Sequence, residues 1–456
     1  MMYTEYRTQC FVLVVTRGEL AIVLLYCTHT PFFCILIMNS DTFNAKFPIY
    51  SLAYHQATSS LILGGGGGPS RSGIPNGLIV LKLTSSPKTK SKFSFEEAGE
   101  LKTGEEAVMS LSIYDDKTDC LVVAGVNDRC WLLEFETTET KSGKSPRVSS
   151  IVKALNNGQS ISPNTTNNSL LNLLRTIQSD SSPNDDGYLR VTRFTASGRS
   201  FLAAGSDGSV REWTAPEMRL LAKVETDSEI LDADGKDENL VIVTSSGQIQ
   251  LNLTKNDPIT LKPSQGFTFK FVRFFDKNPL LLAVENFKVS PMTSSKSSKR
   301  NPKLVFFNES ITALKPKKSH TLPISKNCTC FIIEESSDHL AFGFADGSLL
   351  IISIKNPSAV YFIKKLAHPF PVTGLAIDSK KGILLSSSAD GQILIHQIPL
   401  KATIPPPPSA FFLLFFVFIA TIFLLIAIFS QNLMKLTEIE DFDSFYNLFP
   451  TEQVEL

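Results

Sequence analysis

A short unit recurs along most of this chain: a turn of small residues, often Asp-Gly, followed by alternating apolar residues. Three clear copies are GSDGSVREW at 205–213, GFADGSLLI at 343–351 and SADGQILI at 388–395. Asp-Gly pairs favour tight hairpin turns because glycine adopts positive φ at little cost. Short apolar runs of period two, with no sustained 3.6-residue period, predict an all-β structure.

The spacing of the units fits the repeat of a β-propeller blade. Asp207 and Ser246 are 39 residues apart, and Asp346 and Asp390 are 44 apart, close to the roughly 40–45 residues of a WD-type blade. Weaker copies and one interrupted unit lie at 74–80, 125–131, 245–251 and 280–308. The sequence therefore predicts a seven-bladed, WD-repeat-like β-propeller. A β-sandwich is the alternative, and the near-constant spacing of the turns disfavours it.

The predicted propeller occupies residues 38–400 and contains two inserts. The first, at about 137–187, is rich in Ser, Asn and Thr, and the second, at about 288–303, is rich in Ser and Lys. Long polar segments of this kind are usually surface loops. Both inserts are therefore expected to lie outside the blades.

A long apolar segment follows the propeller. Residues 410–429 read AFFLLFFVFIATIFLLIAIF, twenty residues without a charge. At 1.5 Å per residue, a helix of this length matches the roughly 30 Å hydrocarbon core of a bilayer. The segment predicts one transmembrane helix, with a buried core helix as the alternative. A Pro-rich linker at 401–409 precedes it, and an acidic tail at 430–456 follows.

The N-terminal residues 1–37 are harder to assign. Their two apolar runs are separated by Thr16-Arg17-Gly18-Glu19, and no cleavage site follows a single apolar region. We interpret them as an upstream extension of the gene model, with an apolar membrane segment as the alternative. The chain is then a single-pass membrane protein whose propeller is cytosolic and whose C-terminus is luminal.

Charge and cysteine content exclude several classes of function. The 44 Lys and Arg residues balance 44 Asp and Glu residues, so the cationic excess of a nucleic-acid-binding protein is absent. Cys328 and Cys330 are the one close cysteine pair; on a regular strand both thiols would point to one face, and their spacing suits neither zinc nor a redox pair. No His, Cys and Asp constellation predicts covalent catalysis, so we do not expect an enzyme.

The unusual feature of the first unit is the glycine loop GGGGGPSRSGIPNG at residues 64–77. It is not a Walker A loop, because Ile74 stands where lysine should follow Gly73, and it lacks the spacing of a dinucleotide-binding loop. Glycines can fold tightly and turn carbonyl oxygens inward, which suits a hard cation. Ile74-Pro75-Asn76 would then form a firm, apolar and amide-bearing tip. A flexible hairpin without function is the alternative.

At these residues the chain resembles a known family. The loop glycines Gly64, Gly65, Gly66 and Gly67, the run Gly73-Ile74-Pro75-Asn76, the opening Phe47-Pro-Ile-Tyr50 and the segment at 367–373 (AHPFPVT) carry the resemblance. They are similar to the Sec-type endoplasmic-reticulum guanine-nucleotide exchange factors of the COPII coat, the prolactin regulatory element-binding protein family. The resemblance covers about residues 45 to 430. An additional glycine, Gly68, and Arg71 depart from its pattern.

The resemblance implies a function and a site. The protein would activate a Sar-type small GTPase at the endoplasmic reticulum membrane and so start coat assembly on COPII vesicles. Asn76 would be the main exchange residue, with Ile74 and Pro75 beside it, on a loop scaffold that also includes Gly73 and Gly77. A potassium ion would be held by carbonyls around Gly64–Gly67. The alternative within this resemblance is a propeller adaptor that promotes exit of membrane cargo without exchanging nucleotide.

Overall fold

The computed structural model describes two units of the chain, one up to Ala402 and one from Thr403 onward. The residues it describes are 11–17, 20–26, 42–69, 72–85, 93–116, 120–136, 170–182, 187–237, 239–253, 256–275, 281–288, 300–307, 316–399, 401–402 and 417–429. Each unit is described by itself.

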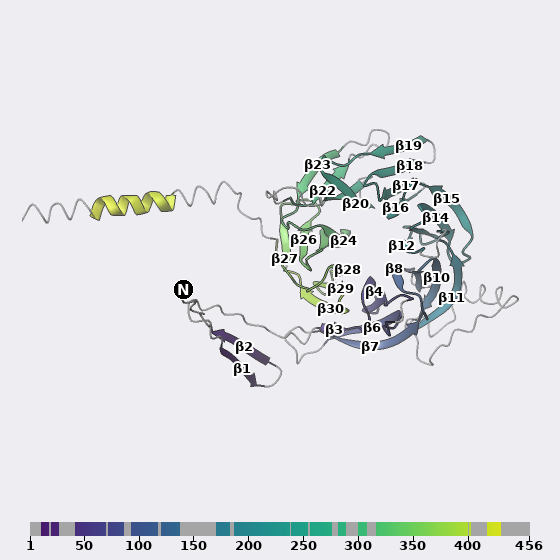
Figure 1. The fold of residues 1–456 in the computed structure, drawn as a ribbon, viewed down its shortest axis with the longest axis horizontal. Coiled ribbons are helices and arrows are strands. Elements are labelled where there is room, and N and C mark those ends of the chain that lie inside the picture. The colour runs from purple at the N-terminus through teal and green to yellow at the C-terminus, as the bar shows by residue number, and fades with distance from the viewer. Residues whose placement is uncertain are drawn as a thin grey trace, which may run out of the picture. The chain divides into compact units, whose positions relative to one another are not determined.

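The first unit contains seven antiparallel sheets of four strands each, arranged around a central axis (Figure 1). This confirms the all-β, seven-bladed propeller.

Blades 1 to 3 are built from β4 (Ile49–His55), β5 (Ser60–Gly65), β6 (Gly77–Ser85) and β7 (Phe93–Lys102); β8 (Val108–Asp115), β9 (Cys120–Val126), β10 (Arg129–Phe135) and β11 (Leu171–Gln178); and β12 (Leu189–Phe194), β13 (Ser200–Gly205), β14 (Ser209–Thr214) and β15 (Leu220–Glu225). Blades 4 and 5 are built from β16 (Ile230–Lys236), β17 (Asn239–Thr244), β18 (Ile249–Leu253) and β19 (Asn256–Leu261), and β20 (Phe267–Phe274), β21 (Leu281–Phe287), β22 (Lys303–Phe307) and β23 (Pro316–Thr321). Blades 6 and 7 are built from β24 (Cys328–Glu334), β25 (His339–Phe344), β26 (Leu349–Ser353) and β27 (Val360–Lys364), and β28 (Val372–Asp378), β29 (Ile383–Ser388), β30 (Gln392–Gln397) and β3 (Thr42–Asn44).

The Asp-Gly turns join the second and third strands of their blades, as their sequence predicts. Gly208, Gly347 and Gly391 all have φ between +70° and +81°, which glycine adopts without steric cost. Each preceding aspartate accepts a hydrogen bond from the backbone N–H two residues on, at 2.9 to 3.1 Å. This local bond stabilises the turn without help from distant parts of the chain.

Packing between the blades forms the core of the propeller. Seven clusters of buried apolar side chains occur in the described part of the chain, one between each pair of neighbouring blades. Alternate residues of each sheet therefore face a neighbouring sheet on either side, which explains why so many short strands are buried on both faces. No blade buries its apolar residues alone.

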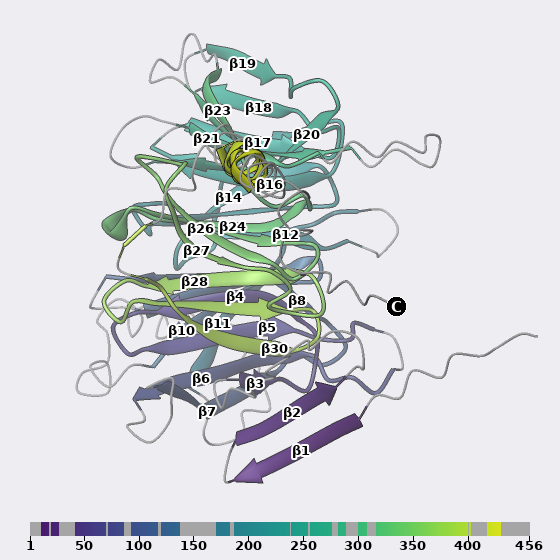
Figure 2. The ribbon, with the colours of Figure 1, turned by 90° about the vertical axis from the view of Figure 1, so that its left-hand side faces the viewer.

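The ring closes because the two ends of the propeller share blade 7. Strand β3, from the beginning of the chain, pairs with β30 from its end, with Phe43 opposite Ile393. Strands β4 and β28 then lie side by side (Figure 2). Across this junction the Tyr54 hydroxyl donates a 2.6 Å hydrogen bond to the Asp378 carboxylate. Closure gives the first and last blades a neighbour on each face, so that neither leaves an apolar sheet face uncovered.

The first predicted insert is shorter than expected. Strand β11 lies inside the range 137–187 and forms the outermost strand of blade 2. Its first residue, Leu171, is fully buried, because the LLNLLRTI run packs on β10 even though polar residues surround it in the sequence. The other described residues of this range, 170, 179–182 and 187, lie outside any strand, and most of the second insert lies outside the described residues.

The terminal segments are described only in part. Strands β1 (Phe11–Arg17) and β2 (Leu20–Tyr26) form a two-stranded antiparallel sheet of their own, and the rest of 1–37 lies outside the described residues. In the second unit, residues 417–429 are helical. Within the described residues, no helix has both the length and the apolar character needed to cross a bilayer. The predicted span at 410–429 is not confirmed, and its residues 410–416, most of the linker and the tail lie outside the described residues.

Candidate functional site: the glycine loop of blade 1

The glycine loop connects β5 to β6 in the first blade. Gly64 and Gly65 belong to β5, where Gly65 pairs with Gly77 on β6 and with Ile49 on β4. The loop itself therefore runs from residue 66 to residue 76, with positions 70 and 71 outside the described residues. The glycine run is partly the end of a central strand and partly a loop.

Two glycines are required by close approach of the backbone. A Cβ atom on Gly65 would lie 2.0 Å from the Pro48 carbonyl oxygen, and one on Gly66 would lie 2.0 Å from Asn76 Oδ1. Gly66 also has φ of +147°, a conformation that residues with a side chain rarely adopt. The loop can pack against its surroundings only because these positions have no side chain.

Asn76 holds the loop from inside. Its side chain is only 6% exposed. Asn76 Oδ1 accepts a 2.8 Å hydrogen bond from the Gly68 N–H, and Nδ2 donates to the carbonyl oxygens of Gly68 at 3.2 Å and Gly104 at 3.1 Å. Both ends of the amide are thus bonded to backbone, which fixes the course of the loop.

The connection from β7 to β8, at 103–107, supports the loop from the neighbouring blade. The Thr103 N–H donates to the Asn76 carbonyl oxygen at 3.2 Å, and the Thr103 hydroxyl donates to the Glu106 carbonyl oxygen. Burial raises the pKa of Glu106 above its ordinary value. The glycine loop is therefore bonded to the connection between blades 1 and 2.

The residues of the predicted tip differ in exposure. Ile74 is 39% exposed, Pro75 is half-buried and Asn76 is buried. Gly73, with φ of +74°, turns the chain just before Ile74. The apolar part of the expected tip is present, whereas the Asn76 amide points into the loop and not outward.

The residues that could hold a cation are neutral oxygens. No group of three or more His, Cys, Asp or Glu side chains arranged for a metal occurs among the described residues. Gly64 and Gly65 are paired on both sides within the sheet, so their carbonyls take part in strand pairing. The Gly68 and Gly104 carbonyls instead both accept hydrogen bonds from one nitrogen, Asn76 Nδ2.

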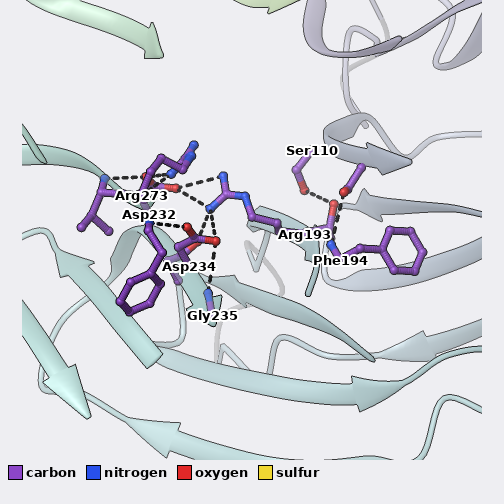
Figure 3. A network of polar contacts seen from close by, with 12 residues as sticks. Ser110, Arg193, Phe194, Asp232, Asp234, Gly235 and Arg273 are labelled. Atoms are coloured by element: carbon purple, nitrogen blue, oxygen red, sulfur yellow. Dashed lines mark hydrogen bonds and ion pairs between the residues drawn. The ribbon is translucent and has the colours of Figure 1, made fainter. Parts of the chain in front are cut away.

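The centre of the ring offers a second group of charges. The innermost strands line a cavity of about 280 Å³ whose charged lining residues include Arg193, Asp232 and Arg273. These three residues and Asp234 form one network of polar contacts (Figure 3). Arg193 lies 3.4 Å from Asp232 and 3.8 Å from Asp234, and Arg273 also contacts Asp232. Burial raises the pKa of Asp234, against the opposing effect of the two arginines. The two arginines and two aspartates form ion pairs that join blades 3, 4 and 5.

The cysteine pair is also structural, but one expectation about it is wrong. Cys328 and Cys330 are free and buried, yet they do not face the same side. Cys328 packs between blades 5 and 6, and Cys330 between blades 6 and 7. A bulge between them, where the pairing with β25 shifts register, reverses the direction of the side chains.

The fold and the loop define the class: a closed seven-bladed propeller that presents a hydrogen-bonded glycine hairpin. Over 405 residues the chain is 24% identical to the guanine nucleotide-exchange factor SEC12 of Rattus norvegicus, covering 80% of this chain and 92% of the relative. The SEC12 protein of Mus musculus is also 24% identical, over 401 residues. This similarity confirms the resemblance to the Sec-type exchange factors.

Other comparisons bear on the fold alone. No protein-family model matches the chain. Among solved structures, Raptor of Chaetomium thermophilum superposes with a TM-score of 0.55 at 12% identity, covering 80% of this chain and 29% of Raptor. The propeller architecture is therefore shared with a protein of very different sequence.

Sequence reasoning did not identify the residues that support the loop. Thr103 and Gly104 lie 27 and 28 positions after Asn76, and their contact with it depends on the return of the chain through β6 and β7. One signal was available: a Thr-Gly pair stands directly between two strands of neighbouring blades, where a connection on the face of the propeller must lie.

We expect Asn76→Ala to lower the free energy of unfolding by about 2 kcal/mol, because three backbone groups at a largely buried position would lose their partner. Urea unfolding would measure the change. Ile74→Ala, at an exposed neighbouring position, is the control and should shift stability by less than about 0.5 kcal/mol. Equal stability of the two variants would show that the Asn76 bonds do not hold the loop.

Proposed function

We propose that this protein is a guanine-nucleotide exchange factor that accelerates GDP release from a Sar-type small GTPase at the endoplasmic reticulum membrane, the step that starts COPII coat assembly. The similarity to the SEC12 exchange factors over four fifths of the chain carries the proposal. The braced glycine loop supplies the contact, because it presents Ile74 to solvent from a backbone that hydrogen bonds keep in place.

Exchange requires binding rather than covalent chemistry. A factor that binds the nucleotide-free GTPase more tightly than the GDP-bound form lowers the barrier to GDP release. A loop already held in one conformation loses little entropy on docking, so more of its binding energy is available to displace nucleotide. In this mechanism Ile74 contacts the GTPase. Asn76 is a positioning residue that keeps the loop closed beneath it.

We expect Ile74→Asp to slow factor-dependent GDP release at least tenfold, because a carboxylate would replace the apolar contact at the centre of the interface. Release of a fluorescent GDP analogue from a purified Sar-type GTPase would measure it. The melting temperature should stay unchanged. Leu221→Asp, an equally drastic change at an exposed position on β15, is the control. Normal exchange by Ile74→Asp would remove the loop from the mechanism.

A cargo adaptor without exchange activity is the second candidate, and the placement of Asn76 favours it. If exchange needs the Asn76 amide to reach the GTPase, a loop that uses both ends of that amide internally would be inactive. Wild-type protein that binds the GTPase but leaves GDP release at its intrinsic rate would support the adaptor. Accelerated release would exclude it.

A potassium ion is proposed as a ligand of the loop. The carbonyl oxygens of Gly68 and Gly104 would contribute to its coordination, because both lie on the same side-chain nitrogen of Asn76 and a carbonyl oxygen has a second lone pair. Of the originally predicted ligands, Gly66 and Gly67 lie beyond the end of β5, whereas Gly64 and Gly65 lie within it. A bound cation would attract the carbonyl oxygens of the loop and so reduce the mobility of a segment that contains few side chains.

We expect the melting temperature to be several degrees higher in potassium chloride than in tetramethylammonium chloride of equal ionic strength, because an ion that binds only the folded state stabilises it. A tetramethylammonium ion is too large to enter such a loop. A third measurement, in sodium chloride, tests whether the site prefers potassium to sodium. Identical melting in all three salts would contradict the cation site.

Attachment to the endoplasmic reticulum membrane is proposed to depend on the apolar segment 410–429, with the propeller cytosolic and the tail luminal. Twenty uncharged, mainly apolar residues have the length and composition for insertion. We expect full-length protein to stay in the membrane pellet after alkaline carbonate extraction, and a chain ending at residue 402 to be released. Complete extraction of the full-length protein would contradict the anchor.

A further inference from the structure

The glycine loop lies on the same face of the propeller as the links between neighbouring blades. In a four-stranded meander, the turn between the second and third strands emerges at the same end as the link to the next blade. The loop between β5 and β6, the link from β7 to β8 and the link from β27 to β28, residues 365–371, therefore lie on one face, which we term the loop face. The bond from Asn76 to Gly104 shows the first two in contact.

A bonded path leads along the loop face from the glycine loop to residues 365–371. Three backbone hydrogen bonds connect successive turns: Gly66 N–H to the Pro48 carbonyl at 3.1 Å, Ala45 N–H to the Gly391 carbonyl at 2.8 Å, and Ala389 N–H to the Pro371 carbonyl at 3.4 Å. The two segments thus lie in neighbouring parts of the ring, separated by the turns of blade 7.

The segment 365–371 presents two large apolar side chains to solvent. Leu366 is 70% exposed and Phe370 is 56% exposed. Leu366 also has φ of +50°, which is rare and unfavourable for a residue with a bulky side chain. A strained backbone carrying an exposed leucine brings no benefit to folding, and such strain is concentrated at functional positions.

Buried contacts hold this segment in place. The Leu366 N–H donates to Ser348 Oγ at 3.1 Å, and the His368 N–H donates to the Gly347 carbonyl at 3.1 Å. The His368 ring is fully buried and lies 2.8 Å from Ser386 Oγ. Burial lowers the pKa of His368 to about 4, so the ring is neutral near pH 7. Leu366 and Phe370 are therefore displayed by a fixed backbone.

We propose that Leu366 and Phe370 form a second contact for the same small GTPase that the glycine loop engages, an inference that rests on the proposed exchange function. Two side chains of this size bury far less than the roughly 800 Å² per partner of a stable interface, so they do not suffice for a dimer of this chain. Together with Ile74 on the same face they become part of one larger surface. In this arrangement Ile74 acts on nucleotide release and the second contact supplies affinity.

The test uses the double variant Leu366→Gly/Phe370→Ala in a GDP-release titration with increasing factor. We expect the concentration for half-maximal acceleration to rise at least tenfold while the maximal rate is retained, whereas Ile74→Asp should lower the maximal rate. Leu220→Ala/Leu221→Ala, which removes two exposed leucines from the outer strand of blade 3, is the matched control and should titrate like wild type.

Stability separates a docking role from a structural one. Glycine adopts positive φ freely, so Leu366→Gly should melt no lower than wild type. A clearly lower melting temperature would assign Leu366 to the fold and overturn the inference.

A wild-type titration by the double variant would overturn it while leaving exchange intact. If wild-type protein neither binds the GTPase nor accelerates release, the proposed function fails and the second contact fails with it. A dimer that dissociates in the double variant would assign the surface to a second copy of the chain.

Discussion

The structure depends on closure of the ring by β3. This short strand adds the fourth strand to blade 7 and packs Phe43 on Phe95 of blade 1, with ring centroids 6.4 Å apart. Because each apolar cluster lies between two blades, every blade depends on both of its neighbours. An open ring would leave one cluster without its second wall and would expose a strand edge. The loop face has fixed geometry only because the ring is closed.

Within the closed ring, hydrogen bonds hold the glycine loop in one conformation, although its sequence suggests flexibility. Five consecutive glycines would be disordered in isolation, since glycine loses the most conformational entropy on folding. Here the missing side chains permit the Pro48 and Asn76 contacts that order the loop. One asparagine amide therefore determines whether the segment behaves as a linker or as a binding surface. In the proposed exchange mechanism, Asn76 would therefore act by positioning the loop and not by touching the partner.

Much of the fold was predictable because its signals are local. The Asp-Gly turns, with their short aspartate-to-backbone bonds, mark three blades directly, and their spacing gives the period. Three features were not predictable because they depend on distant parts of the chain. Strand β11 follows a polar insert, the bulge at Cys328 and Cys330 is set by pairing with β25, and the inward position of Asn76 depends on Gly104. For the candidate site, the motif predicted Ile74 at a tip of the loop, and Ile74 is exposed. The exposure of Leu366 was not predicted, because the sequence alone does not show which leucine will adopt positive φ.

The bond between Asn76 and Gly104 has a mechanical consequence. Any force that a partner applies to Ile74 passes through Asn76 into the segment that leads from blade 1 to blade 2, and from there into strands packed on both sides. The glycine loop cannot move by itself without breaking its hydrogen bond to the connection between blades 1 and 2. If a partner docks on Ile74 as proposed, deformation would consequently be concentrated in the partner and not in the propeller.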